Sequence, residues 1–98
     1  MDLEVAMLQA KDGHAAGLVK AMNEDGGSAA LASAPGCRSV KVLPGIENPG
    51  TVLFLVEWDS VEAHNSGKAS DGFKKFVEIA SPWFGGPGGG SMQHFKLA

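Results

Sequence analysis

Two side chains able to do chemistry stand six residues apart near the middle of the sequence, the indole of Trp58 and the imidazole of His64. An imidazole has an unperturbed pKa of about 6.5, so His64 could act as a general base near neutral pH. The indole of Trp58 offers one N–H donor on an apolar body. Each also has a plainer interpretation, because a tryptophan at a strand end often belongs to the core and a histidine at a helix start can face solvent. The pair is therefore a candidate site.

A predicted strand and a predicted helix bring these two side chains together. Residues 51–58 alternate at period two, with Val52, Phe54, Val56 and Trp58 on one face. Asp59 and Ser60 then offer side-chain oxygens that can cap a helix beginning near Val61, and Asp59 with Glu62 resembles a capping box. Strand ends and helix starts are common positions for binding sites.

The remaining candidate groups favour structural roles. His14 and His94 lack the spacing of metal ligands, so no metal site is predicted. Cys37 has no neighbouring His or Lys and is interpreted as a small buried hydrophobe. The glycine-rich run at 85–90 lacks the Lys-Ser/Thr ending of a phosphate-binding loop. Lys74 and Lys75 fit a solvated helix face better than an anion clamp.

Length and composition limit the function classes. Ninety-eight residues with 44% apolar and 19% charged side chains predict one globular domain spanning 1–98. A net charge of −3 with one arginine, Arg38, argues against a nucleic-acid partner. No apolar run reaches membrane-spanning length, and the N-terminus lacks a signal-peptide pattern, so no membrane partner is expected. A single cysteine fits a reducing compartment, and the cytoplasm is the expected location.

The order of predicted elements defines the fold class. Strands are expected at 3–11, 37–43, 51–58 and 92–97, with a helix after Asp12 that resumes near Ser28, and a second helix from Val61 that breaks near Gly67 and resumes at Asp71. Asp12 and Ser28 are expected to cap the two pieces of the first helix. The resumed second helix is expected to bury Phe73, Phe76, Val77 and Ala80, and a glycine-rich flexible loop is expected at 85–90. This β-α-β-β-α-β order predicts an α+β, ferredoxin-like sheet with both helices on one face.

The strands carry apolar side chains on both faces, which a solvated sheet face does not require. Leu53 and Leu55 oppose the inward set of the third strand, and the first strand is apolar on both sides as well. A second copy of the chain is the simplest cover for the other face, so a homodimer with packed sheets is expected.

Several motifs, in this order and spacing, resemble the antibiotic biosynthesis monooxygenase-like (ABM) family across nearly the whole chain. The motifs are Pro35-Gly36-Cys37, Asn48-Pro49-Gly50, Glu57-Trp58-Asp59-Ser60 with Glu62-Ala63-His64, and Pro82-Trp83-Phe84-Gly85-Gly86-Pro87. The resemblance implies a dimeric α/β barrel with a substrate cavity in each subunit between sheet and helices. Members include quinone-forming monooxygenases, haem-degrading enzymes and an isomerase.

The match to the cofactor-independent monooxygenases of this family is partial. Trp58 looks like the tryptophan that ends their third strand. His64 stands where they carry a tyrosine, and Phe54 stands where they carry an asparagine. Their helix arginine would fall near Lys74 or Lys75. The haem-degrading members carry a tryptophan and a histidine at positions that look like Gly67 and Val77 here, so no haem is expected.

The resemblance implies two functions that the sequence leaves open. One is a cofactor-independent monooxygenase that oxidises a polyphenol or hydroquinone-type metabolite with O₂, using His64 as base and Trp58 as donor in a dry cavity. The other is a non-catalytic dimeric protein, or a related isomerase, that uses the same cavity for a small aromatic or lactone-like molecule. No flavin, haem or metal is expected in either case. The predicted substrate-binding residues are Phe54, Val56, Phe73, Phe76 and Lys75.

Overall fold

The computed structural model describes residues 1–85 and 90–97. The sheet consists of β1 (Asp2–Gln9), β2 (Cys37–Pro44), β3 (Thr51–Trp58) and β4 (Gly90–Lys96). The helices are α1 (Ala15–Asn23), α2 (Gly27–Ala32), α3 (Val61–Gly67) and α4 (Asp71–Ala80), with short 3-10 turns η1 (Lys11–Gly13) and η2 (Ser81–Trp83). The glycine-rich loop predicted at 85–90 lies mostly outside the described residues. Within the described ranges, no helix is both long and apolar enough to cross a membrane.

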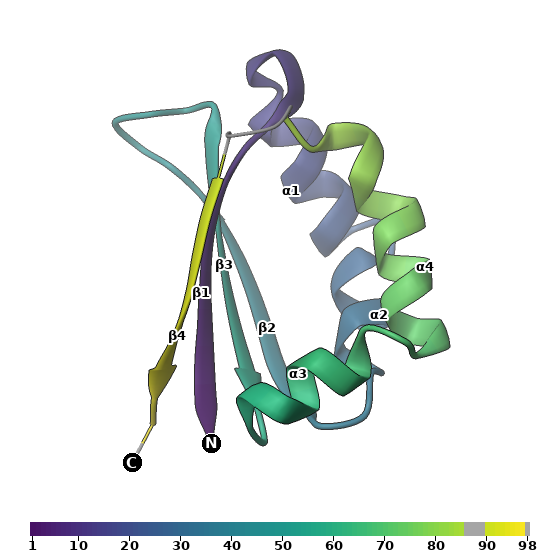
Figure 1. Cartoon of the computed structure of the whole chain (residues 1–98). Helices are drawn as coiled ribbons and strands as arrows, with labels where there is room; N and C mark the ends of the chain where they lie inside the picture. The colour runs from purple at the N-terminus through teal and green to yellow at the C-terminus, as the bar shows by residue number, and fades with distance from the viewer. Residues whose placement is uncertain (86–89, 98) are drawn as a thin grey trace.

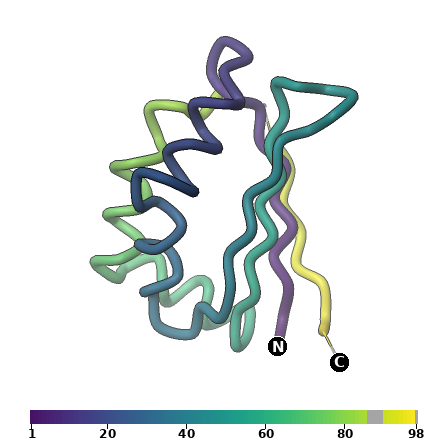
Figure 2. The backbone as a smooth tube through the Cα atoms, turned by 180° about the vertical axis from the view of Figure 1, so that it is seen from behind, coloured from purple at the N-terminus to yellow at the C-terminus, as the bar shows by residue number. Residues whose placement is uncertain are grey.

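The four strands form one antiparallel sheet in the order β2-β3-β1-β4. The described helices all pack against one face of the sheet, and in the described part of the chain the opposite face carries no helix (Figure 1). The N- and C-terminal strands run side by side, which brings the two termini to the same end of the sheet (Figure 2). This arrangement confirms the α+β, ferredoxin-like fold predicted from the element order.

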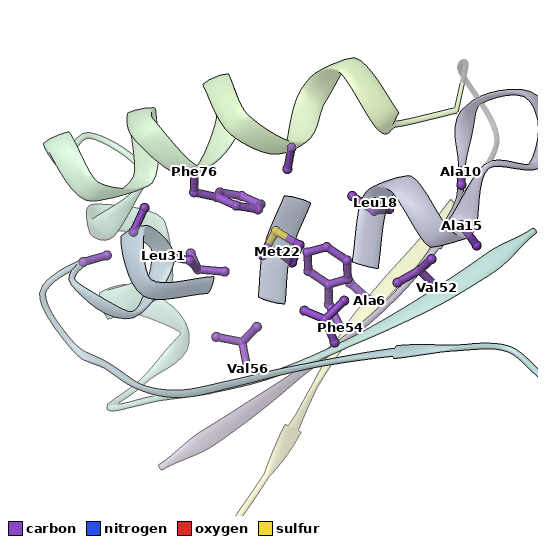
Figure 3. Packing of buried hydrophobic residues seen from close by; sticks show 14 of the residues in the cluster. Ala6, Ala10, Ala15, Leu18, Met22, Leu31, Val52, Phe54, Val56 and Phe76 are labelled. Carbon is purple, nitrogen blue, oxygen red and sulfur yellow. The ribbon is translucent and has the colours of Figure 1, made fainter. Parts of the chain in front are cut away.

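The inward face of β3 is the base of the core. Val52, Phe54, Val56 and Trp58 are all buried, as the period-two alternation predicted. Phe54 projects from the sheet toward Phe76 of α4, and their ring centroids lie 6.3 Å apart (Figure 3). Leu18, Met22 and Leu31 from α1 and α2 fill the space between the sheet and α4.

The junction after β3 forms as predicted, with Ser60 as the capping residue, but without the capping box. Ser60 is the N-cap of α3, and its hydroxyl accepts a 3.0 Å hydrogen bond from the Ala63 N–H. The capping box proposed for Asp59 and Glu62 is wrong, because the Asp59 carboxylate pairs with Arg38 instead. The N–H of Val61 donates at 2.9 Å to the carboxylate of Asp2, which ties the helix start to β1.

The second helical segment breaks and resumes where the sequence predicted. Helix α3 ends at Gly67, and α4 begins at Asp71 with the Ser70 hydroxyl accepting from the Phe73 N–H. Phe76 and Ala80 are buried and Phe73 is half-buried. Burial of Val77 was a wrong prediction, because its side chain lies on the solvent side of α4.

Both caps predicted for the first helical region are also wrong. Asp12 lies within the η1 turn at a positive φ of 53°, and α1 begins after His14 without a side-chain cap. Helix α2 begins two residues earlier than predicted, with Gly26 as its N-cap at a φ of 94°. A glycine adopts that left-handed conformation without strain, so the chain turns there without a capping side chain from Ser28.

Candidate functional site

A cavity of about 230 Å³ lies between the sheet and the helices. Most of its wall is apolar and comes from β1, β3, α2, α4 and the ends of η2 and β4. Its polar groups lie on β1 and around α3. The lining residues are Glu4, Ala6, Leu8, Leu31, Phe54, His64, Lys68, Phe73, Phe76, Phe84 and Met92.

Four polar side chains form a connected network at this end of the sheet. The indole Nε1–H of Trp58 donates a 3.0 Å hydrogen bond to Oε1 of Glu4. Nε2 of His64 lies 3.4 Å from the same carboxylate oxygen, and Nδ1 of His64 lies 2.7 Å from Nε2 of His94. The rings of Trp58 and His64 are stacked with centroids 4.7 Å apart and planes 12° apart. The predicted proximity of Trp58 and His64 is therefore direct ring contact.

The strand registers explain why these residues converge. Glu4 on β1 pairs with Val56 on β3 and with His94 on β4, so its side chain points to the helix side, as those of Val56 and His94 do. Trp58 follows two residues after Val56 on the same face of β3. Helix α3 then starts at Val61 and carries His64 back over the sheet, onto the indole.

Burial determines the protonation preferences of the network. Burial lowers the pKa of His64 to about 4, with smaller contributions from the nearby charges of Lys68 and His94. Burial likewise raises the pKa of Glu4, and the Trp58 hydrogen bond and the charges of His94 and Lys68 oppose that rise. His64 is only 3% exposed and is therefore a neutral imidazole near neutral pH.

The network contains residue types that bind metal ions, but they are not arranged around one point as metal ligands are. Glu4, His64 and His94 can each present one ligand atom within 4.8 Å of the others, so these three residues could hold a cation. In the structure, however, His64 turns one ring nitrogen toward Glu4 and the other toward His94. A single ion binds only one nitrogen of an imidazole, so this arrangement is a line of hydrogen-bonding groups rather than a convergent set of ligands.

The predicted site residues fall into two groups. Phe54, Phe73, Phe76 and His64 line the cavity. Three others lie elsewhere in the structure. Val56 is fully buried in the core and is not among the lining residues, Lys75 is exposed on α4, and Trp58 is fully buried with its only donor engaged by Glu4.

Three polar residues at the site were missed from the sequence. Lys68 lines the cavity from the C-cap of α3, one turn beyond His64, whereas sequence comparison pointed to Lys74 or Lys75. His94 was set aside because it lacks the sequence spacing of a metal ligand. Glu4 did leave a signal, since it shares the inward face of β1 with Ala6 and Leu8 and so placed a carboxylate on a face expected to be apolar.

The fold and the cavity together define a ferredoxin-like α+β protein with a cavity between its sheet and its helices. A family model described as antibiotic biosynthesis monooxygenase matches residues 1–79, so the chain belongs to that family. No curated protein matches the chain.

Solved structures show the same fold at low sequence identity. A protein from Bordetella bronchiseptica, provisionally named an antibiotic biosynthesis monooxygenase, is 19% identical with a TM-score of 0.82, and the match covers 99% of this chain and 96% of that one. A protein from Chloroflexus aurantiacus with the same provisional name is 17% identical with a TM-score of 0.76, covering 99% and 92% of the two chains. At these identities the likeness establishes the fold and leaves the substrate open.

Replacing Trp58 by Phe should destabilise the protein through Glu4. The substitution keeps an aromatic ring in the core and removes the N–H that satisfies a buried carboxylate oxygen, which should lower the free energy of unfolding by about 1–3 kcal/mol. Urea unfolding at neutral pH measures the change. Trp83→Phe is the matched control, since Trp83 is 37% exposed and should lose less. Equal losses in the two variants would contradict a stabilising role for the Trp58–Glu4 bond.

Acid should destabilise the fold through His64. Its pKa is about 4 in the folded chain against 6.5 for the free group, so the unfolded chain binds the proton more readily. The free energy of unfolding should therefore fall as the pH drops through this window, and should fall less in His64→Gln. The groups facing His64 are Glu4, His94 and Lys68, and they remain in that variant. His14→Gln, at an exposed position, is the control, and identical pH slopes in all three proteins would refute this assignment.

Proposed function

We propose that this protein is an ABM-type, cofactor-independent monooxygenase that oxidises a small phenol with O₂. The observation that carries the proposal is an apolar, aromatic-walled cavity with the buried imidazole of His64 in its wall. Such a cavity excludes water from an anionic intermediate and places a proton acceptor beside the substrate hydroxyl. Membership of the family supports an oxygenase chemistry in general terms.

The cavity limits the size of the substrate. A buried apolar cavity of about 150 Å³ is enough to bind benzene. The volume of about 230 Å³ found here therefore suits one substituted ring or a small fused pair of rings. Phe54, Phe73 and Phe76 supply ring faces and edges against which an aromatic substrate can pack.

The reaction balances without an external reductant. His64 accepts the proton of the phenol hydroxyl, and the resulting phenolate gives electrons to O₂. One oxygen atom replaces the hydrogen on the ring carbon para to the hydroxyl, and the second oxygen leaves as water. A phenol and O₂ thus give a quinone and water, with the substrate as the only electron donor. Lys68, which also lines the cavity, supplies a positive charge for the phenolate.

The assignment of catalytic roles changes from the sequence-based hypothesis at one residue. Trp58 has its single N–H directed to Glu4. We therefore propose that Trp58 orients that carboxylate and does not contact the substrate. His64 keeps the role of base.

A second candidate function is binding without turnover. Phe54 is 2% exposed and lines the cavity with an apolar ring at the position where related oxygenases are expected to carry an amide. A dimeric binding protein for a small aromatic or lactone-like molecule, or a related isomerase, would use the same cavity without O₂. If Phe54→Asn raises O₂-dependent turnover, the scaffold is competent for oxygenation and this chain has lost part of that activity, which would count against a pure binding protein.

Oxygen consumption with a panel of phenols, hydroquinones and polyphenols tests the oxygenase proposal. The purified protein should consume O₂ and form the quinone, and His64→Ala should lower turnover by about 10²-fold or more. His14→Ala is the matched control, because His14 is an exposed imidazole that does not line the cavity. Tight binding of these compounds without O₂ uptake would overturn the oxygenase and leave the binding protein.

We also propose that the protein is a homodimer whose subunits pack sheet against sheet. The face of the sheet opposite the helices carries apolar side chains from all four strands. Register pairs Leu3 with Phe95 and Leu43 with Leu53 on this face, and Met7, Leu43 and Phe95 are each about half exposed. Apolar surface of this extent on one face is typical of a contact between copies.

Two broader expectations stay proposals. β1 pairs directly with β4, so the beginning and end of the described chain share one sheet, which favours a single domain over 1–98. One unpaired cysteine, Cys37, favours a reducing compartment such as the cytoplasm.

Replacing Leu55 by Lys should weaken the dimer. The new ammonium group would lie at the centre of the outer sheet face, where burying it against a second sheet is unfavourable. Light scattering and sedimentation should show a dimer for the wild type at micromolar concentration and a larger monomer fraction for Leu55→Lys. Ile46→Lys is the control, since Ile46 is 90% exposed in a loop. A folded wild-type monomer under these conditions would rule out the dimer.

A further inference from the structure

The network around His64 extends from the buried core to the edge of the sheet, where its last member is more exposed to solvent. Glu4 lies on the inner strand β1 and is 9% exposed, and His64 is 3% exposed. His94 is half-buried on β4, which is an edge strand of the described sheet. The two imidazole rings meet at 2.7 Å between Nδ1 of His64 and Nε2 of His94, a distance suited to proton transfer.

The contacts of His64 determine which nitrogen is free for a substrate. Nδ1 is engaged by His94. Nε2 lies 3.4 Å from the Glu4 carboxylate, longer than an ordinary hydrogen bond, so it can still accept a proton from a molecule in the cavity. A neutral imidazole with an accepting Nε2 carries its proton on Nδ1, and that proton then points at Nε2 of His94.

We propose that Glu4, His64 and His94 form a proton relay that takes a proton from a phenolic substrate in the cavity and delivers it to the rim of the sheet. The substrate class of this relay rests on the proposed function. The relay also assigns positioning roles to Glu4 and His94, two residues that the family resemblance did not point to. The substrate hydroxyl loses its proton to Nε2 of His64 while the Nδ1 proton of His64 passes to Nε2 of His94. One proton enters the imidazole and one leaves it, so His64 ends neutral and His94 ends as an imidazolium.

Burial explains why a second histidine is needed. A proton held by His64 would leave a charge in the core, which desolvation disfavours. His94 is closer to solvent and can carry that charge or release it. The Glu4 carboxylate, held by Trp58, lies 3.4 Å from the Nε2 atom on which the proton arrives, so its negative charge stabilises the positive charge of the ring during the transfer.

The remaining charge near the relay suits an anionic product of this step. Lys68 lines the same cavity, and Glu4, His94 and Lys68 are the charged or titratable groups that face His64 from β1, β4 and the end of α3. Once the proton has left, the phenolate remains in the cavity with the Lys68 ammonium as its counter-charge.

The first test measures the relay without turnover. The probe is 4-nitrophenol, an acidic phenol whose ionised form absorbs visible light. Bound to the wild type it should ionise at lower pH than in buffer, and His94→Ala should move that midpoint back up by about one unit or more. His14→Ala should leave the midpoint unchanged. For 4-nitrophenol shown to be bound, a wild-type midpoint equal to that in buffer, or an unchanged midpoint in His94→Ala, would overturn the relay.

Nitrogen NMR of the histidine side chains tests the hydrogen bond itself and needs no ligand. The relay requires His64 protonated at Nδ1, with Nε2 of His94 accepting from it. A His64 protonated at Nε2, or two rings that titrate independently, would overturn the proposal. If 4-nitrophenol fails to bind, the substrate class and the proposed function fail, and the NMR result alone then decides whether the relay exists.

Kinetics separate a relay from a structural role for His94. With a phenol that the wild type turns over, His94→Ala should lose activity by less than His64→Ala, and imidazole added to the buffer should restore part of it. Glu4→Gln, which keeps an oxygen for the Trp58 N–H, should displace the pH–rate profile. If added imidazole does not restore activity to His94→Ala, the role of His94 is structural packing and the relay is refuted. Stoichiometric binding of Zn²⁺ or Co²⁺ that is lost in His94→Ala would replace the relay with a metal site.

Discussion

A carboxylate inside an apolar core is tolerated only when its oxygens are satisfied, and the arrangement around Glu4 follows from that requirement. The Trp58 indole supplies the donor from the end of β3, which places a large flat ring beside the carboxylate. His64 stacks on that ring, and so its own nitrogens are oriented toward Glu4 and His94. Three strands and one helix are thereby joined through a single buried network at the edge of the cavity.

The same network divides the cavity wall into two functional parts. The aromatic part, built from β3 and α4, can hold a ring by packing alone. The polar part combines a neutral base with a buried carboxylate and a lysine, which is the combination needed to remove a proton and keep the resulting anion. Specificity for a phenol would arise from having both parts within one small volume.

Membership of the family and the details of the site carry different information. The family match and the solved structures establish how the sheet and helices are arranged. The site departs from the expected oxygenase pattern at Phe54 and His64, so the proposed chemistry depends on residues particular to this chain. Glu4 and His94 are the residues whose arrangement makes a different route for the proton physically reasonable.

Local pattern was sufficient for the fold. The alternation in residues 51–58, the break at Gly67 and the restart at Asp71 are all properties of short segments, and the element order they define was confirmed. The capping predictions failed at Asp12 and Ser28 because the backbone turns there, at Asp12 and Gly26, with positive φ and without a side-chain cap. The prediction failed at Asp59 because Arg38, from another part of the chain, pairs with its carboxylate. Trp58 and His64 could be placed together because only six residues separate them.

The rest of the site depended on tertiary structure. Glu4 and His94 are 90 residues apart in the sequence and become neighbours only through the antiparallel pairing of β1 with β4. The direction of a side chain at a helix end likewise decides that Lys68 lines the cavity while Lys75 does not. Sequence alone determined which chemical groups were available, and the strand register determined which of them meet, because pairing across a sheet is set by the burial of a whole face.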